Sequence, residues 1–191
     1  MIIAVDLDDV LSATTPAFID YYNTIRKTDF RLEDFHTYYW HNIVGEARDD
    51  VFRLVHDFYF SPDFAPKPVI GAIEGIKKLA QSHSLHIVTS RQEEFADITH
   101  KWVNNHFPTL FQKVHIANHA HWATQGTSRT KKEICQEIGA EVLIEDNLDY
   151  IEECADLGIR SILLDRPWNK SKTPKSTTRA YSWNDIITNL A

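Results

Sequence analysis

Two aspartates, Asp6 and Asp8, directly follow the apolar N-terminal run Met1-Ile-Ile-Ala-Val5. In an extended chain, residues two apart point to the same side, so these two carboxylates lie together. Carboxylates that close repel each other, and a bound divalent cation is the usual relief. Glu145 and Asp146 form a second acidic pair after another apolar run. Oxygen donors without a cysteine ligand favour Mg²⁺ over Zn²⁺.

Hydroxyl and cationic residues provide partners for an anion beside such a metal. Thr89 and Ser90 end one apolar run, and Lys131 and Lys132 stand where a helix is expected to begin. Hydrogen-bond donors and a cation next to a metal ion are the groups that hold a phosphate, so phosphate is the natural ligand of this set. Ser90, three residues before Glu93, also fits a helix N-cap, and both roles can hold together.

Each of these groups stands at the end of a short apolar run or at the start of a helix. Such runs are typical of buried β-strands, and segments with helical spacing of apolar residues separate them. The expected strands are residues 1–5, 85–89, 114–117, 142–144 and 161–164. Alternating strands and helices predict an α/β fold with a Rossmann-like parallel sheet covered by helices on both faces. Because ligands bind at the carboxyl ends of such strands, the polar groups converge on one edge.

The interval between the first two strands is too long for a simple crossover. A βα connection needs little more than a dozen residues, but residues 12–68 contain helical patterns of their own, one of them with Pro16 at the first helical position. We therefore expect residues 12–68 to form a small helical cap on a core of residues 1–11 and 69–191. Its proline-rich end, residues 61–68, is predicted to be an extended linker.

Aromatic residues concentrate in the expected cap. Most must fill its own small core, and we expect a minority to stack on a base of the substrate. The candidates for that role are Phe18, Tyr22, Phe35 and the run Tyr38 to Trp40. Near the other end of the chain, residues 169–179 are rich in lysine, serine and threonine and are predicted to be a solvated loop before a short final helix.

Composition and charge exclude several classes of protein. The 191 residues are 43% hydrophobic and 25% charged, which is ordinary for a globular domain. A net charge of −7 argues against binding to a nucleic-acid polymer or a membrane surface, since both require a basic face. Cys135 and Cys154 lack metal-ligand spacing and are predicted to be reduced structural thiols. No apolar run approaches the ~18 residues of a membrane span, so we expect a cytoplasmic protein. A homodimer stays open as an alternative to a monomer.

Ten histidines offer an alternative metal site, particularly His115, His119 and His121. No carboxylate or cysteine partner stands at ligand spacing from them, so we favour structural roles for these histidines.

Four motifs in their order along the chain resemble those of the haloacid dehalogenase (HAD) superfamily of phosphohydrolases. They are Asp6 to Val10, Thr89-Ser90, Lys131 and Ile144 to Asp146. The insert resembles the helical cap that this superfamily places between its first two motifs. Together with the stretch Leu164 to Asn169, the motifs look most like the 5′(3′)-deoxyribonucleotidase family and its nucleotidase-like relatives. The resemblance covers nearly the whole chain.

The resemblance implies a role for each matching residue. Asp6 would attack phosphorus and become an aspartyl phosphate. Asp8 would protonate the leaving oxygen and then deprotonate the attacking water, which demands a raised pKa. Thr89 and Ser90 would hydrogen-bond a phosphoryl oxygen, and Lys131 would offset charge on the phosphate and on Asp6.

The same resemblance implies a metal site. Mg²⁺ would be held by Asp6, by the main-chain carbonyl of Asp8 and by Asp146. Glu145 and Asp149 would surround these ligands and support them.

The sequence also departs from the family pattern. Asp9 stands where this family often has glycine, and Arg91 stands where the deoxyribonucleotidases tend to have an apolar residue. Arg91 is expected to contact the substrate or to pair with Asp9. Of the two lysines, Lys131 fits the relatives better than Lys132, although the sequence does not settle the choice.

The expected function is that of a Mg²⁺-dependent phosphomonoester hydrolase acting on a small phosphorylated molecule, with a 5′-nucleotide as one candidate. The alternatives are a phosphatase for another small metabolite and a catalytically silent HAD-like module that binds a phosphorylated ligand or a protein. A halide-releasing dehalogenase is disfavoured, because such enzymes do not need the acid that Asp8 provides.

Overall fold

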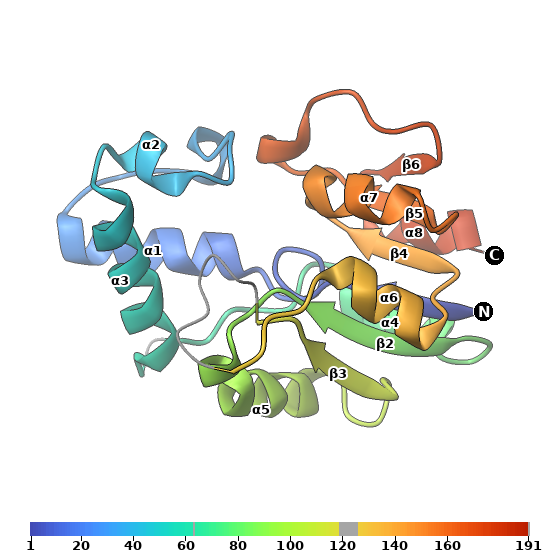
Figure 1. Ribbon diagram of the computed structural model, residues 1–191. Coiled ribbons are helices and arrows are strands. Elements are labelled where there is room, and N and C mark those ends of the chain that lie inside the picture. Colours follow the sequence, from blue (N-terminus) through green and yellow to red (C-terminus); the bar gives the residue numbers. More distant parts are fainter. Residues whose placement is uncertain (63, 119–125, 191) are drawn as a thin grey trace.

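The computed structural model describes residues 1–62, 64–118 and 126–190. Its sheet has six parallel strands in the order β3-β2-β1-β4-β5-β6 (Figure 1). The strands are β1 (Ile2–Val5), β2 (Ser84–Thr89), β3 (Lys113–Ile116), β4 (Val142–Glu145), β5 (Arg160–Leu164) and β6 (Thr177–Ala180). The predicted Rossmann-like α/β fold is confirmed. The strand order reverses between β1 and β4, which is the point where such sheets open a ligand crevice.

The sixth strand corrects the prediction of a solvated loop over residues 169–179. β6 pairs in parallel with β5, from Ser161 opposite Thr177 to Leu164 opposite Ala180. Its four residues include two threonines and an arginine but no apolar run, so hydrophobic patterning gave little sign of it. Arg179 of β6 is held by an ion pair with Asp165 at 2.8 Å.

Helices cover both faces of the sheet, as predicted. One face packs against α4 (Ala72–Leu79), α5 (Ala96–His106) and α8 (Trp183–Leu190), and the other against α6 (Lys131–Ile138) and α7 (Leu148–Ala155). Two 3₁₀ helices, η2 (Glu93–Phe95) and η3 (Pro167–Asn169), follow β2 and β5. The core strands are apolar on both sides, as in other parallel sheets with helices on two faces. Cys135 and Cys154 are buried, free thiols in the α6–α7 layer.

The long interval between β1 and β2 is helical. It contains α1 (Thr14–Arg26), the 3₁₀ helix η1 (Leu32–Asp34), α2 (Trp40–Val44) and α3 (Arg48–Phe60). These elements lie together beyond the carboxyl ends of the strands (Figure 1), and we call them the helical insert. They share an aromatic core of their own, which includes Phe18, Tyr22 and Phe58. The two chain segments that join the insert to the sheet pair with each other, through Ala13 N–H to the Lys67 carbonyl and Val69 N–H to the Leu11 carbonyl.

Helix α1 begins at Thr14, two residues before the predicted start at Pro16. The first four backbone N–H groups of a helix have no partner within it, so proline is tolerated at the third position. Asp9 takes up one of these orphan donors, since its carboxylate accepts the Thr15 N–H at 3.0 Å. Among the helices of the described residues, none is long and apolar enough to cross a membrane.

Two histidines face each other on neighbouring strands. His86 Nδ1 of β2 lies 3.2 Å from His115 Nε2 of β3. Burial, Lys113 and His86 together lower the pKa of His115 to about 4. Within the described residues, the only cluster of three metal-ligating side chains contains no histidine. His119 and His121 lie outside the described residues.

The lowered pKa of His115 predicts that acid reduces the stability of the fold. An unfolded histidine binds its proton near pH 6.5, but folded His115 binds one only near pH 4. Between these values the unfolded state holds more protons, so this residue lowers the stability of the fold as the pH falls from 6.5 to 4. We expect His115→Gln to lose less stability over this interval than the wild type, as measured by urea unfolding at each pH.

His100→Gln is the matched control, because His100 is exposed on α5. It should follow the wild-type profile. Parallel profiles for His115→Gln and the wild type would contradict the prediction.

Candidate active site

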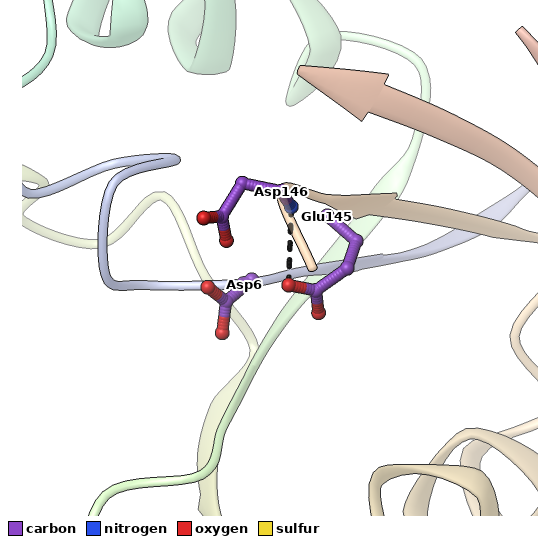
Figure 2. Close-up of side chains that lie close together, drawn as sticks. All are labelled: Asp6, Glu145 and Asp146. Atoms are coloured by element: carbon purple, nitrogen blue, oxygen red, sulfur yellow. Dashed lines mark hydrogen bonds between the residues drawn. The ribbon is translucent and has the colours of Figure 1, made fainter. Parts of the chain in front are cut away.

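Three carboxylates meet where β1 and β4 end side by side. Asp6 follows β1, Glu145 ends β4 and Asp146 follows it, and the Asp6 N–H donates to the Ile144 carbonyl at 2.9 Å. One ligand oxygen from each of Asp6, Glu145 and Asp146 lies within 4.8 Å of the others, and all three residues are buried (Figure 2). The strand register thus brings together residues about 140 positions apart in the chain.

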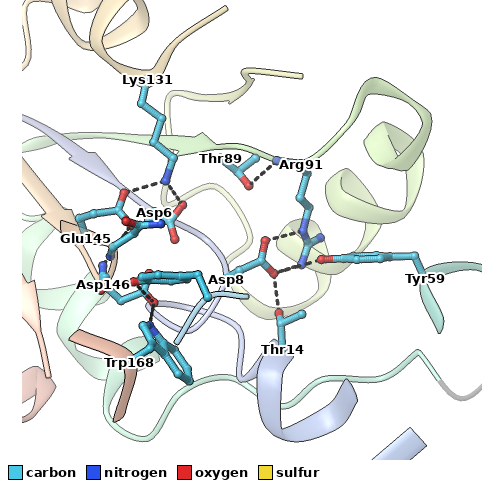
Figure 3. Close-up of polar contacts among 12 residues, drawn as sticks. Asp6, Asp8, Thr14, Tyr59, Thr89, Arg91, Lys131, Glu145, Asp146 and Trp168 are labelled. Carbon is cyan, nitrogen blue, oxygen red and sulfur yellow. Dashed lines mark hydrogen bonds and ion pairs between the residues drawn. The ribbon is translucent and has the colours of Figure 1, made fainter. Parts of the chain in front are cut away.

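Lys131 reaches this cluster, and Lys132 does not. Helix α6 begins at Lys131 behind a capping box formed by Thr130 and Glu133. Lys131 is 2% exposed, and its Nζ donates to Asp6 Oδ1 at 2.5 Å and to Glu145 Oε2 at 2.6 Å (Figure 3). Lys132 instead lies at the surface, where it pairs with Asp156 at 3.4 Å. Of the two lysines, Lys131 is therefore the one that lies beside the carboxylates.

The cluster holds more negative charge than Lys131 neutralises. Burial and Glu145 raise the pKa of Asp6, while Lys131 pulls it down. Burial, Asp6 and Asp9 raise the pKa of Asp146. Burial also raises the pKa of Glu145, to about 7. Groups with such raised pKa values gain from a bound cation, because it favours their ionised forms.

The hydrogen bonds separate the carboxylates that support the site from those that can hold a metal. Glu145 accepts Lys131 on Oε2 and the N–H groups of Asp146 and Asn147 on Oε1, so it shapes the loop after β4. Asp6 accepts Lys131 on Oδ1, and Asp146 accepts Trp168 on Oδ2 at 2.7 Å. Within the described part of the chain, each of these two aspartates thus keeps its other oxygen for a cation. This all-oxygen donor set fits Mg²⁺.

Asp8 corrects one prediction from the sequence. Arg91 Nε and Nη2 donate to the two oxygens of Asp8 at 3.0 and 2.7 Å, and Thr14 donates to Oδ1 at 2.5 Å (Figure 3). Burial would raise the pKa of Asp8, but the charge and hydrogen bonds of Arg91 outweigh it and lower the pKa. The expected raised pKa is therefore wrong for this state. Arg91 itself is stacked near the ring of Tyr59, 4.9 Å from its centroid.

Asp9 is not the partner of Arg91. Its carboxylate accepts the backbone N–H and the hydroxyl of Thr15. Its backbone is left-handed, with a φ of 59°, a conformation that costs a non-glycine residue ~1–2 kcal/mol. The chain turns here, and the Thr15 contacts help to hold the turn.

Thr89 and Ser90, the two hydroxyl residues at the end of β2, differ in their access to the cavity. Thr89 is fully buried, and its Oγ1 accepts the Arg91 N–H at 3.3 Å. Ser90 is the residue of this pair that lines the cavity above the carboxylates. Ser90 is not a helix N-cap, because the 3₁₀ helix η2 begins after Gln92.

A cavity of about 280 Å³ opens between the carboxylates and the helical insert. Tyr38, Tyr39 and Trp40 line it from the insert, Arg91 lines it from the segment after β2, and Lys131 from the start of α6. Tyr38 also contacts the carboxylate cluster, since its hydroxyl donates to the Asp146 carbonyl at 2.5 Å.

Besides Thr89, four residues predicted for the site lie away from the cavity. Phe18 and Tyr22 are buried in the aromatic core of the insert, and Phe35 is fully buried beside Trp40. Phe18 instead supports Trp40, whose ring stacks on it at 4.6 Å. Asp149 is exposed in the first turn of α7 and is not part of the carboxylate cluster. Sequence patterning could not fix which side of each helix faces the cavity.

The sequence pattern of the family described as "5' nucleotidase, deoxy (Pyrimidine), cytosolic type C protein" matches residues 1–190. The chain belongs to this deoxy-type 5′ nucleotidase family. It is therefore a hydrolase of the HAD phosphatase type. The predicted resemblance to the HAD superfamily is confirmed.

Proteins similar to this member of the 5′ nucleotidase family match nearly its whole length. A nucleotidase of Clostridium acetobutylicum is 22% identical over 189 residues, which cover 96% of this chain and 90% of that protein. A HAD-like hydrolase of Streptococcus pneumoniae has the same fold, with a TM-score of 0.73, 11% identity and coverage of 100% and 98% of the two chains. The HAD hydrolase YfnB of Bacillus subtilis, solved with bound magnesium, has a TM-score of 0.60, 13% identity and coverage of 99% and 97%.

The surplus negative charge predicts that Mg²⁺ stabilises the folded protein. A ligand present at one hundred times its dissociation constant adds about 2.7 kcal/mol to the free energy of unfolding. We expect added Mg²⁺ to raise the Tm, and more so at pH 8 than at pH 6, because protons compete with the ion for Asp6 and Asp146, whose pKa values are raised to about 7 and about 8. Asp146→Asn should raise the metal-free Tm, by relieving repulsion, and lose most of the Mg²⁺ shift.

Glu152→Gln, on the exposed side of α7, removes the same charge outside the cluster and should keep the wild-type shift. An equal Mg²⁺ shift in Asp146→Asn and in the wild type would show that the ion binds elsewhere. The Tm of each variant, with and without Mg²⁺, is measured by differential scanning calorimetry.

Proposed function

We propose that this protein is a Mg²⁺-dependent phosphomonoester hydrolase that acts on a small molecule through an aspartyl-phosphate intermediate. We further propose nucleoside 5′-monophosphates as its first class of substrates. The observation that carries the proposal is the buried cluster in which Asp6 lies between Lys131 and Asp146, at the bottom of a cavity. The family description and the nucleotidase of C. acetobutylicum support the choice of substrate class.

Asp6, Asp146 and the main-chain carbonyl of Asp8 would hold the metal. When bound, Mg²⁺ supplies positive charge that offsets the negative charge of the phosphoryl group. Glu145 keeps the loop after β4 in place by accepting two of its backbone N–H groups. Lys131 favours the ionised form of Asp6, which is the form that attacks phosphorus, against the opposing effects of burial and Glu145.

In the first step Asp6 attacks phosphorus, the bond to the substrate oxygen breaks, and that oxygen takes a proton from Asp8. In the second step water attacks phosphorus of the aspartyl phosphate, the bond from phosphorus to Asp6 breaks, phosphate leaves, and Asp8 receives the proton of the water. The Arg91 ion pair favours Asp8 as the carboxylate that the second step needs. The same ion pair opposes the protonated form that the first step needs, so Asp8 must take up its proton against Arg91.

Residues 12–68 would act as the cap that selects the substrate, over a core of residues 1–11 and 69–191. Ser90 would donate to a phosphoryl oxygen, and Tyr39 and Trp40 would stack on a base; the position of all three in the cavity lining supports these roles. The cavity volume of about 280 Å³ is at the lower end for a small-molecule site. The cytosol is the proposed location, in agreement with the cytosolic type named in the family's description.

Removal of the nucleophile tests the mechanism. Asp6→Asn should lower phosphate release from nucleoside 5′-monophosphates and from p-nitrophenyl phosphate by at least about 10³-fold, because no covalent intermediate can form. Mass spectrometry of quenched wild-type enzyme should show a hydroxylamine-labile phosphate on Asp6. Phosphate binding by the wild type without any turnover would instead favour a catalytically silent binding module.

Tyr39→Ala tests recognition by the insert, since Tyr39 is 62% exposed and lines the cavity. Loss of one stacking side chain should cost ~1–3 kcal/mol per base, so kcat/KM for a nucleoside monophosphate should fall roughly 5- to 150-fold. The kcat/KM for glycerol phosphate, which has no ring, should stay unchanged. Phe60→Ala removes an exposed ring of α3 that does not line the cavity and should alter neither. Equal losses on both substrates would place base recognition outside Tyr39.

A further inference from the structure

The loop after β5, residues 165–169, lies beside both acidic loops although none of its residues belongs to the carboxylate cluster. We call it the β5 loop. Trp168 Nε1 donates to Asp146 Oδ2 at 2.7 Å (Figure 3). Asn169 Nδ2 donates to the Asp146 main-chain carbonyl, also at 2.7 Å. The side chain and the backbone of Asp146 are therefore both held by this loop.

Trp168 differs from the donors that hold the other carboxylates. Lys131 pairs with Asp6 and Glu145, and Arg91 pairs with Asp8, so each of these groups faces a cation. In the described part of the chain, Asp146 has no ion pair. Its oxygen is fixed instead by the neutral N–H of an indole. A neutral donor orients a carboxylate and leaves its charge for a metal ion, whereas a lysine or arginine at this position would compete with that ion.

The β5 loop is itself rigidly held. Asn169 is fully buried and uses its whole amide: Nδ2 also donates to the Leu164 carbonyl at 2.9 Å, and Oδ1 accepts the Arg166 N–H and Arg179 Nη1. All four hydrogen-bonding positions of the amide are thus filled. Arg179 comes from β6, so the strand at the edge of the sheet anchors the loop.

The same loop reaches the segment that carries Asp6 and Asp8. Arg166 Nε donates to the Asp9 carbonyl at 2.9 Å, and its Nη2 donates to the same oxygen. The β5 loop therefore joins the segment after β1 to the segment after β4, across the crevice between these strands.

We propose that Trp168 is a positioning residue for the metal: its indole N–H fixes Oδ2 of Asp146 and so presents the other oxygen to Mg²⁺. The proposal rests on the metal site of the proposed function. Tyr38 cannot take over this role, since its hydroxyl has a single proton and donates it to the Asp146 carbonyl at 2.5 Å, while it lies 3.4 Å from Oδ2. Without the indole N–H, the carboxylate of Asp146 is free to turn away from Asp6.

Trp168→Phe tests this role, because phenylalanine keeps an aromatic ring and lacks the N–H. Isothermal titration calorimetry with MgCl₂, without substrate, should show Mg²⁺ affinity about 10- to 100-fold weaker than in the wild type. The Mg²⁺ concentration that half-activates phosphate release should rise by the same factor, while kcat at saturating Mg²⁺ stays within about threefold.

Trp102→Phe is the matched control, since the Trp102 indole donates at 2.8 Å to the carbonyl of Pro66, which neither lines the cavity nor touches the carboxylates. It should keep the wild-type Mg²⁺ affinity even where its Tm falls. Should Trp168→Phe fail to fold, β-(3-benzothienyl)alanine placed at position 168 replaces the N–H by sulfur in a ring of the same shape, and should weaken Mg²⁺ binding equally.

Mg²⁺ affinity within twofold of the wild type, in a folded variant without the position-168 N–H, would overturn the role of Trp168. The titration needs no turnover, so its outcome is separate from that of the proposed function. If the wild type binds Mg²⁺ and releases no phosphate, the proposed hydrolase function is refuted. The Mg²⁺ affinity of Trp168→Phe still tests the role of Trp168 in that case. Phosphate release that is unaffected by EDTA, together with no heat of Mg²⁺ binding in the wild type, would overturn both.

Discussion

The repulsion among buried carboxylates at the ends of β1 and β4 is the constraint on which the rest of the structure depends. A parallel sheet with this strand order brings Asp6 and Asp146 together, although they lie far apart in the sequence. Such charges are tolerated in a protein interior only where they are paired or can take a metal. Each neighbouring element supplies a hydrogen-bond donor to these carboxylates: α6 contributes Lys131, the segment after β2 contributes Arg91, and the β5 loop contributes Trp168.

These supports are of two kinds, and the difference has a chemical meaning. Lys131 and Arg91 pair with Asp6 and Asp8, the groups proposed to do covalent and proton chemistry, and favour their ionised forms. Asp146 is oriented by a neutral donor, and its charge is left uncompensated. A site arranged in this way gains free energy when the metal binds.

Much of this arrangement could be predicted from the sequence, because it depends on local pattern. Apolar runs that stop at Asp6, Thr89 and Glu145 predict strands, and the carboxyl edge of a parallel sheet follows from their alternation with helices. β6 could not be predicted in this way, because its residues Thr177–Ala180 carry no apolar run and its place is set by pairing with β5. The start of α1 at Thr14 likewise depends on a contact with Asp9 from outside the helix.

Side-chain partners were harder to predict than elements, for a physical reason. The expected pairing of Arg91 with Asp9 is wrong, because Arg91 pairs with Asp8, and that contact reverses the direction of the Asp8 pKa shift. Contact of Arg91 with the substrate stays a prediction. Phe18 and Tyr22 were expected in the cavity, but the phase of α1 places them in the insert's core. Trp168 carries neither charge nor catalytic chemistry, so no motif of reactive residues could indicate it. Its importance follows only from the position of one N–H relative to one carboxylate oxygen, which depends on β5, β6 and Asn169 together.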